Sequence, residues 1–338
     1  MTLYRLRLTL SGPLGTPLTS GTIFGHLCWA YRDAHGEPAL ESWLRELPEK
    51  PWMISDGFPA EHLPCPLIPP AVPAPARPDK MTRDKLRSLE ADKERRKHPF
   101  IPRARWRDLR VGLTPAKLAQ HACDAPVLNQ CWHGLHSLAA KLAQHACDAP
   151  VPAEHRIAHN TIDRRTATTP DTGGLWFVDE FWPGAKSLAA DIYVRAPASA
   201  DEVGKLFRAV GESGYGRDAS TGRGTFSLTI DPAPELDSPP PAGGTPRMLS
   251  LSHGSISANM QDACYKLTAH FGKVGRSMLA NVQRPWKLPI LLARPGATFI
   301  PADDGPFGAW LTRVHQDRPE IGHNAFHLAI PFTLAERR

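Results

Sequence analysis

The chain has 338 residues, of which 41% are hydrophobic and 22% charged, and its formal net charge is +6 at pH 7. This length and composition are those of a soluble globular protein with one or two domains rather than of a disordered chain, and the 35 prolines argue against a compact all-helical bundle. No stretch reaches the roughly 18–20 consecutive apolar residues of a membrane span, and the first residues lack the apolar run of a signal peptide, so we expect a cytoplasmic protein with reduced cysteines.

The N-terminal segment predicts a strand, a helix and a second strand. Leu3–Leu10 largely alternates apolar and polar residues, which is the period of a half-buried strand. Thr22–Arg32 carries apolar residues at helical spacing, among them Ile23 and Leu27. Trp52–Ser55 is a short apolar run closed by an Asp-Gly pair, which indicates the second strand.

A proline-rich and basic stretch interrupts this pattern. Seven prolines lie between Pro64 and Pro78, and they exclude regular hydrogen-bonded structure there. Arg77–Arg110 contains 13 Lys or Arg and six Asp or Glu, so almost all of the excess positive charge of the chain lies in it. We interpret residues from about 60 to 155 as a large insertion in the first domain, and residues 59–102 as lying on the surface.

The insertion contains an exact internal duplication. Ala116–Val127 recurs, letter for letter, as Ala140–Val151. Two copies are too few for a solenoid, which needs about three repeats to bury a continuous core. The His-x-Cys and Cys-x-His spacings in and between the copies differ from the pattern of structural zinc sites, so we expect no metal and no other cofactor.

Regular structure resumes after the insertion. Gly174–Phe181 and Ala189–Val194 have the character of strands, Ala200–Gly211 of a helix with one apolar face, and Thr225–Ile230 of a further strand. When the two strands before this helix are taken as one hairpin, the chain order approximates the split βαβ, or ferredoxin-like, arrangement. The fold class is therefore α+β.

The composition also divides the chain into units. We expect a first domain over residues 1–232 that includes the insertion, a Pro/Gly-rich linker over 233–246, and a smaller β-rich domain over 247–338. Strands in the second domain are predicted near Met248–Ser252, Tyr265–His270, Lys287–Ala293 and His327–Phe332.

A glycine-rich segment is the strongest local signal for function. It spans Gly214 to Gly224 and has four glycines in eleven residues, with arginines and hydroxyl side chains between them. Such a loop lets its backbone approach a phosphate chain while N–H groups and guanidinium groups point at it. It is neither a Walker loop nor a dinucleotide fingerprint, since no Gly-Lys-Ser/Thr follows and a helix precedes it. The other interpretation of this segment is a connecting turn that binds no ligand.

A second polar segment runs from His159 to Thr166 and is followed by an aromatic strand that contains Trp176 and Phe177. Its arginines suit phosphate groups, and a protruding hairpin could carry them. The two aromatic residues are candidates either for a contact surface or for the core. His159 could act as a general acid or base, but without an identifiable partner a hydrogen-bonding role is the simpler interpretation.

These segments, in this order, resemble a known family. The matching pieces are Leu6–Gly12, Ser20–Trp29, Ser55–Pro59, Leu63–Pro66, His159–Thr166, Gly214–Gly224, Phe271–Gly275 and Arg284–Ile290. They look like subunit four of the Csm complex, in the RAMP superfamily of CRISPR proteins. The resemblance covers most of the chain except residues 67–150, and the Ser55–Pro59 and Gly214–Gly224 pieces are its most specific parts. The duplicated Cys/His block departs from the family pattern.

The resemblance implies two ferredoxin-like domains and a non-catalytic role: holding the 5′ tag of the CRISPR RNA at the foot of a type III-A effector. It also implies docking to the large polymerase/cyclase-like subunit and to a backbone RAMP subunit, with target RNA met only indirectly. The residues it assigns to RNA binding are Gly214, Tyr215, Gly216, Arg217, Ser220, Thr221, Gly222, Arg223, Gly224, His159, Asn160, Arg164, Arg165, Ser20 and Lys273.

Two other functions remain open at this stage. The chain could be a metal-independent endoribonuclease that processes CRISPR repeats with His159 or His26 as acid or base, although one phosphate needs both an acid and a base and no paired histidines stand out. It could also be the equivalent tag-binding subunit of a type III-B or type IV complex. We expect the non-enzymatic role.

Overall fold

The computed structural model describes residues 1–69, 99–121, 153–182, 189–239, 243–275 and 284–336. Its first unit is built on an antiparallel sheet in the strand order β2-β8-β1-β9, with β3 also pairing β8. The strands are β1 (Leu3–Leu10), β2 (Met53–Ile54), β3 (Phe58–Pro59), β8 (Ala189–Arg195) and β9 (Phe226–Pro232). The strands β1, β2, β8 and β9 each lie within two residues of a strand that the sequence predicts, whereas β3 was not predicted.

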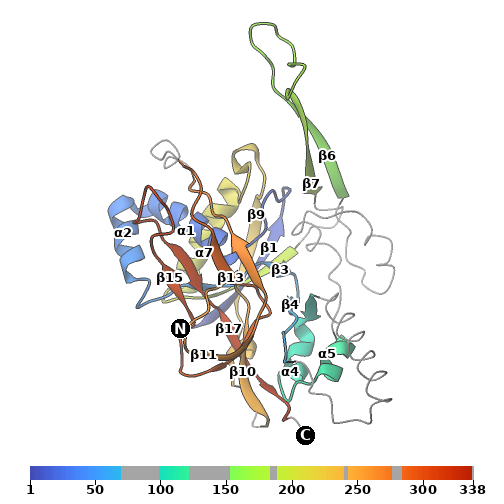
Figure 1. Cartoon of the computed structure of the whole chain (residues 1–338), viewed down its shortest axis with the longest axis vertical. Coiled ribbons are helices and arrows are strands. Elements are labelled where there is room, and N and C mark those ends of the chain that lie inside the picture. The colour runs from blue at the N-terminus through green and yellow to red at the C-terminus, as the bar shows by residue number, and fades with distance from the viewer. Residues whose placement is uncertain (70–98, 122–152, 183–188, 240–242, 276–283, 337–338) are drawn as a thin grey trace, which may run out of the picture.

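Two helices cover one face of this sheet (Figure 1). In α1 (Ser20–His35) the apolar side chains of Ile23 and Leu27 are buried, as their spacing predicts. The other helix, α7 (Ala200–Ser213), begins with a capping box in which Ser199 and Glu202 exchange hydrogen bonds, and it ends at Gly214 with a φ of 82°. The first unit therefore has a strand, helix, strand, helix and strand in the predicted order. The expected hairpin of Gly174–Phe181 with Ala189–Val194 is wrong, because Leu175–Trp182 lies outside this sheet and pairs with Ala153–Asn160 instead.

A further helix, α2 (Glu37–Glu46), follows α1 directly and was not expected from the sequence. Gly36, with a φ of 87°, separates the two helices, and Pro38 lies in the first turn of α2. Proline suits that position because its missing N–H has no partner within the helix. The apolar residues of this helix recur at helical spacing: Leu40 and Leu47 are buried, and Trp43 and Leu44 pack against the core.

The second unit repeats the strand order of the first with different connections. Its main sheet has the order β11-β14-β10-β17 and consists of β10 (Thr245–Ser250), β11 (Met260–Cys264), β14 (Thr298–Pro301) and β17 (Ala329–Leu334). Two-stranded ribbons join them: β12 (Leu267–His270) with β13 (Ile290–Ala293), and β15 (Gly308–Leu311) with β16 (His323–Phe326). Within residues 243–275 and 284–336 no helix is present, which differs from a full ferredoxin-like domain.

The described ends of the insertion are packed rather than on the surface, which corrects the expectation for residues 59–69 and 99–102. Here β4 (His62–Pro64) pairs with β5 (Phe100–Pro102), and η1 (Arg103–Arg105), α4 (Trp106–Leu109) and α5 (Pro115–His121) follow. Leu63, Ile101 and Trp106 are buried in one cluster with Leu249 and Ile330 of the second unit. Burial of these apolar side chains between the two units holds the ends of the insertion in place.

The linker is also packed rather than free. A short helix, α8 (Pro234–Asp237), lies within it, and Leu236 is fully buried in the same cluster. Residues 70–98 and the duplication beyond residue 121, with its cysteines and histidines, lie outside the described residues.

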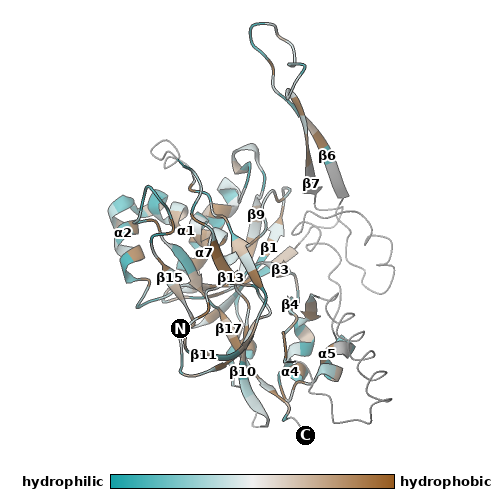
Figure 2. Ribbon diagram, viewed as in Figure 1, coloured by the Kyte–Doolittle hydropathy of each residue, from teal (hydrophilic) through white to brown (hydrophobic). Residues whose placement is uncertain are grey.

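A long hairpin projects from the body of the molecule (Figure 1). It consists of β6 (Ala153–Asn160) and β7 (Leu175–Trp182), joined by the polar segment from Thr161 to Gly174. Figure 2 shows apolar stretches along this hairpin, away from the core. Across the parts of the chain that the structure describes, the helices are too short or too polar to cross a bilayer.

Candidate functional site

The glycine-rich loop has a conformation that requires its glycines. Gly214, Gly216, Gly222 and Gly224 all have positive φ angles, between 66° and 86°. A Cβ at Gly224 would lie 2.1 Å from the carbonyl oxygen of Tyr215, so the two ends of the loop approach each other too closely for any other residue. The loop is therefore a specific, closed structure that includes the short helix η3 (Ala219–Thr221).

Contacts with the N-terminal segment hold the loop. The hydroxyl of Tyr215 donates to the carbonyl of Pro17 at 2.6 Å, and the N–H of Gly216 donates to Nε2 of His26 on α1 at 3.0 Å. The N–H of Arg217 donates to Oγ1 of Thr16 at 2.8 Å. These N–H groups already have protein acceptors, so they are not free to bind a ligand. The exposed residues of the loop are Arg217, Asp218, Ser220, Thr221 and Gly222.

The two arginines of the loop differ in environment. Arg223 is only 6% exposed and its guanidinium forms an ion pair with Asp218. Arg217 is exposed, and its Nε lies 3.5 Å from Asp218. Arg223 is therefore part of the structure of the loop, whereas Arg217 can reach a ligand in solvent.

The projecting hairpin meets the loop at one point. Nη2 of Arg223 lies 3.5 Å from Nε2 of His159, and the His159 ring stacks on Trp176 with centroids 5.7 Å apart and an interplanar angle of 12°. The two segments that the sequence singled out are thus neighbours in space. They are 64 residues apart in the chain, and only the fold brings them together.

The hairpin presents both cations and aromatic rings to solvent. Trp176 and Phe177 are 44% and 51% exposed, so the core role that the sequence left open for them is not observed. The guanidinium of Arg156 lies 4.9 Å from the centroid of the Phe177 ring. Arg164 and Arg165 are exposed near the tip. Asn160 is exposed as well, and its amide donates to Thr169 at 3.1 Å.

Two residues assigned by resemblance lie elsewhere. Ser20 is buried, and its N–H donates to Oδ1 of Asp56 at 2.9 Å while its hydroxyl donates to the carbonyl of His253 at 3.2 Å. Ser20 therefore joins the two units. Lys273 is exposed and its Nζ lies 5.6 Å from the centroid of the Trp286 ring, at the edge of a separate cleft.

Sequence reasoning missed the junction around Asp56 as a structural centre. Its carboxylate is fully buried, accepts from the N–H of Ser20, and lies 2.6 Å from Nδ1 of His253. The Ser-Asp-Gly-Phe motif is visible in the sequence, but nothing local indicates that its carboxylate faces the second unit.

In the described residues, no group of three or more His, Cys, Asp or Glu is placed to hold a metal ion.

Comparisons with known proteins show the fold. No family model and no curated protein matches the sequence. The chain is similar to a chain of a Csm1–Csm4 cassette solved with AMPPNP, at 14% identity and a TM-score of 0.54, over 99% of this chain and 100% of that one. It is also similar to a chain of a Csm3–Csm4 subcomplex of the type III-A CRISPR-Cas interference complex, at 13% identity and a TM-score of 0.55, over 98% and 100%.

A third similar structure is a Csm1–Csm4 cassette solved with cA4, at 13% identity and a TM-score of 0.55, over 99% of this chain and 100% of that one. The component that these assemblies share by name is Csm4. The resemblance to subunit four of the Csm complex is therefore confirmed at the level of the fold.

Proposed function

We propose that this chain is a non-catalytic, cytoplasmic RNA-binding subunit of a type III CRISPR effector, and that it holds the 5′ tag of the CRISPR RNA. In this proposal both units are variants of the ferredoxin-like arrangement, the second with its helices replaced by loops and β-ribbons. The strand order that the two sheets share supports this interpretation.

The observation that carries the proposal is the meeting of His159 with Arg223, which joins the hairpin and the glycine-rich loop into one surface. The loop exposes Arg217. The hairpin exposes the Trp176 ring on the face that meets the loop, and the Phe177 ring, with Arg156 over it, on the opposite face. Single-stranded RNA is held by cations that follow its backbone and by aromatic rings on which its bases stack. The loop and the hairpin together carry both kinds of group.

The partners are proposed from the similar structures. Those assemblies contain Csm1 or Csm3 together with Csm4. We propose that this chain docks an equivalent large polymerase/cyclase-like subunit and an equivalent backbone RAMP subunit.

The alternative of a repeat-cleaving endoribonuclease has weaker support. His26 accepts the N–H of Gly216 through Nε2 and packs on the Tyr215 ring at 4.8 Å, so its ring serves the structure of the loop. His159 is stacked on Trp176 beside Arg223. Cleavage of RNA needs an acid and a base around one phosphate, and this arrangement supplies no second histidine ready for that role.

One experiment tests the proposal against the alternative. The purified chain is titrated with a labelled RNA that carries a CRISPR repeat-derived 5′ tag, in EDTA, and both binding and RNA integrity are followed. We expect saturable binding and intact RNA, with affinity reduced in a variant that carries Arg164→Ala, Arg165→Ala and Arg217→Ala. A Lys205→Ala variant on the exposed side of α7 is the control. Cleavage that disappears with His159→Ala would show that the chain is an enzyme.

A further inference from the structure

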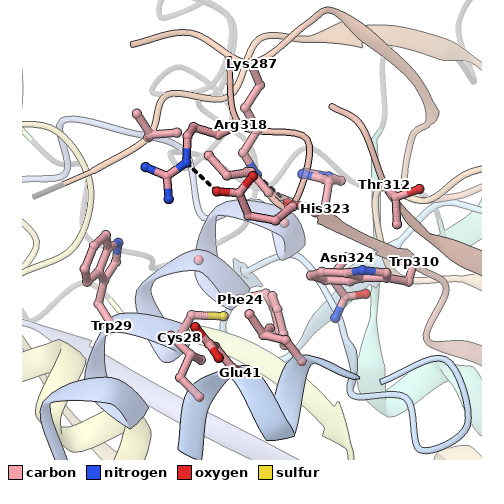
Figure 3. Close-up of a pocket in the computed structure, with 18 of the residues that line it drawn as sticks. Phe24, Cys28, Trp29, Glu41, Lys287, Trp310, Thr312, Arg318, His323 and Asn324 are labelled. Atoms are coloured by element: carbon pink, nitrogen blue, oxygen red, sulfur yellow. Dashed lines mark hydrogen bonds and ion pairs between the residues drawn. The ribbon is translucent and has the colours of Figure 1, made fainter. Parts of the chain in front are cut away.

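A cleft of about 690 Å³ lies between the two units, away from the glycine-rich loop. Residues from α1 and α2 form one side, and residues 273–275 and 310–324 of the second unit form the other. Figure 3 shows Phe24, Cys28 and Glu41 on one side of the cleft, with Lys287, Arg318 and His323 facing them. Its volume falls in the range of small-molecule sites.

The α1 side of the cleft is kept open by a glycine. Gly25 lies inside α1, and no heavy atom lies within 4 Å of where its Cβ would be. Gly21, one turn earlier, is different, because a Cβ there would lie 2.4 Å from the ring of His323. Glycine destabilises a helix interior relative to alanine, and packing gives no reason for it at position 25. The open space above Gly25 is available to a ligand.

Aromatic rings flank this open space. Trp29 and Trp310 lie on opposite sides of the cleft (Figure 3). The Trp310 ring meets Phe24 edge-on, with centroids 5.9 Å apart, and the Arg32 guanidinium lies 4.2 Å from the Trp29 ring centroid. Flat aromatic walls with a nearby cation suit an aromatic, anionic ligand.

Lys287 is one of the cations that line the cleft. Its Nζ donates to the carbonyl of Gly322 at 2.7 Å, and among the described residues no carboxylate forms an ion pair with it. Burial lowers the pKa of Lys287 to about 8. An ammonium with three donors and one backbone acceptor can donate to an anion in the cleft. Lys273 lies at the rim as a second cation.

His323 adds a polar atom without a partner. The residue is only 4% exposed, and its Nε2 is buried with no hydrogen bond in the described structure. Burial, followed by the positive charge of Lys287, lowers the pKa of His323 well below its usual value, so the ring is neutral.

Positive side chains outnumber negative ones in the lining of the cleft. The acidic residues are Glu37, Glu41 and Glu320, and the basic residues are Arg32, Arg45, Lys273, Lys287 and Arg318.

We propose that this cleft binds a nucleoside phosphate, with the base against Trp29 or Trp310 and the phosphate at Lys287 and Lys273. The ligand is either a free nucleotide or the phosphorylated end of an RNA, because both present the same chemistry. The cleft uses none of the exposed arginines of the loop and hairpin. Failure of tag binding at that surface and failure of nucleotide binding here are therefore separate results.

The test measures adenosine 5′-monophosphate binding to the full chain by calorimetry and by quenching of tryptophan fluorescence. We expect saturable binding, a loss of affinity of at least tenfold with Lys287→Met, and much weaker binding of adenosine, which lacks the phosphate. Lys205→Met on α7 is the matched control and should bind as the parent does. No saturable binding, or equal binding by parent and Lys287→Met, would overturn the proposal.

A pair of substitutions at Gly25 tests the place of binding. Gly25→Leu should fill the cleft and abolish binding, whereas Gly25→Ala should keep binding and raise thermal stability, which separates blockage from misfolding. Unchanged binding in Gly25→Leu would place the ligand elsewhere and overturn the proposal. Competition with a 5′-phosphorylated tetranucleotide then identifies the source: competition indicates an RNA end, and its absence a free nucleotide.

Discussion

The carboxylate of Asp56, which is completely buried, lies 2.6 Å from Nδ1 of His253, 197 residues further along the chain. The other carboxylate oxygen accepts the N–H groups of Ser20 and His253, at 2.9 and 3.2 Å. One side chain of the first unit thus satisfies polar groups of both units. A buried carboxylate is stable only when it is paired and hydrogen-bonded in this way, so the contact fixes how the two units sit against each other.

Replacing Asp56 should therefore destabilise the whole molecule. Asp56→Ala leaves the N–H groups of Ser20 and His253 without an acceptor, and we expect it to lower the free energy of unfolding by about 2–4 kcal/mol. Urea unfolding followed by far-UV circular dichroism measures the loss. Asp231→Ala, at an exposed carboxylate, is the control and should cost less than about 1 kcal/mol. An equal loss of unfolding free energy in the two variants would mean that Asp56 stabilises the protein no more than an exposed carboxylate does.

The elements with a strong local pattern could be predicted from the sequence. The helix around Ile23 and Leu27 and the strand Leu3–Leu10 have clear periods, and both lie where expected. The helix after Gly36 was missed although Leu40, Trp43 and Leu44 mark an apolar face at helical spacing, because Gly36 and Pro38 beside it suggest a break in the chain. The burial of Trp106 was missed for another reason: its partners come from the second unit, and a basic, proline-rich neighbourhood suggests exposure.

The site was predictable in its residue types and not in its arrangement. Glycines at positions 214 and 224 indicate a closed loop because no other residue tolerates such a close approach of backbone. The sequence cannot tell Arg217 from Arg223, since both lie in the same loop. Their different roles arise from Asp218 and from His159, which the fold brings from 64 residues away.

Acid should weaken an ion-pair network on the sheet face opposite the helices. Burial acts to raise the pKa of Glu61, but hydrogen bonds from Arg103 and Arg7 outweigh it and lower the pKa to about 2. A carboxyl with a depressed pKa contributes stability that is complete above its unfolded pKa of about 4.5 and disappears as the pH falls towards 2. Because Glu61 is about half exposed, solvent screening limits the effect to the order of 1 kcal/mol.

The Glu61→Gln variant checks this prediction through the pH dependence of thermal unfolding. Between pH 6 and pH 2.5 the parent should lose more stability than the variant, and above pH 6 the parent should be the more stable of the two. Parallel curves over that range would mean that Glu61 is not the group responsible.

The two loop arginines should behave differently when each is replaced. Arg217→Ala should leave thermal stability unchanged and lower the salt dependence of RNA binding by about 0.7 units of slope, the value for one lost phosphate contact to a single strand. Arg223→Ala should instead lower the midpoint of thermal unfolding, because it leaves Asp218 without its buried partner. Salt titrations and thermal melts of both variants distinguish an arginine that contacts RNA from one that stabilises the loop. The same salt slope in Arg217→Ala and parent would mean that the loop is only a turn.

The hairpin should contribute to RNA binding in two separable ways. Trp176→Ala and Phe177→Ala remove stacking platforms, and each should weaken binding by about 1–3 kcal/mol without changing the salt slope. Arg164→Ala and Arg165→Ala remove charge, and each should lower the slope. Fluorescence anisotropy at four salt concentrations distinguishes the two effects. An aromatic variant that binds as tightly as the parent would assign those rings to a protein contact instead.

The isolated chain should be a poorly soluble monomer. Several large apolar side chains are exposed on the second unit and near the β12–β13 ribbon: Leu267, Phe271, Trp286, Leu288 and Leu291. Exposed apolar residues gathered in this way are typical of a surface that another protein covers. A subunit that binds one end of an RNA has no need of a closed homo-oligomer, so we expect its neighbours to be different proteins.

Light scattering of the chain alone, and of the chain with a large subunit or CRISPR RNA, tests this expectation. Leu291 is 66% exposed on β13, so Leu291→Lys should reduce aggregation of the isolated chain without lowering its thermal stability. If that ribbon is a docking surface, the same substitution should weaken co-purification with the large subunit or the backbone subunit. A stable symmetric homodimer that ignores RNA and both subunits would contradict the assignment to an effector complex, because its apolar surface would then already be covered by a second copy of itself.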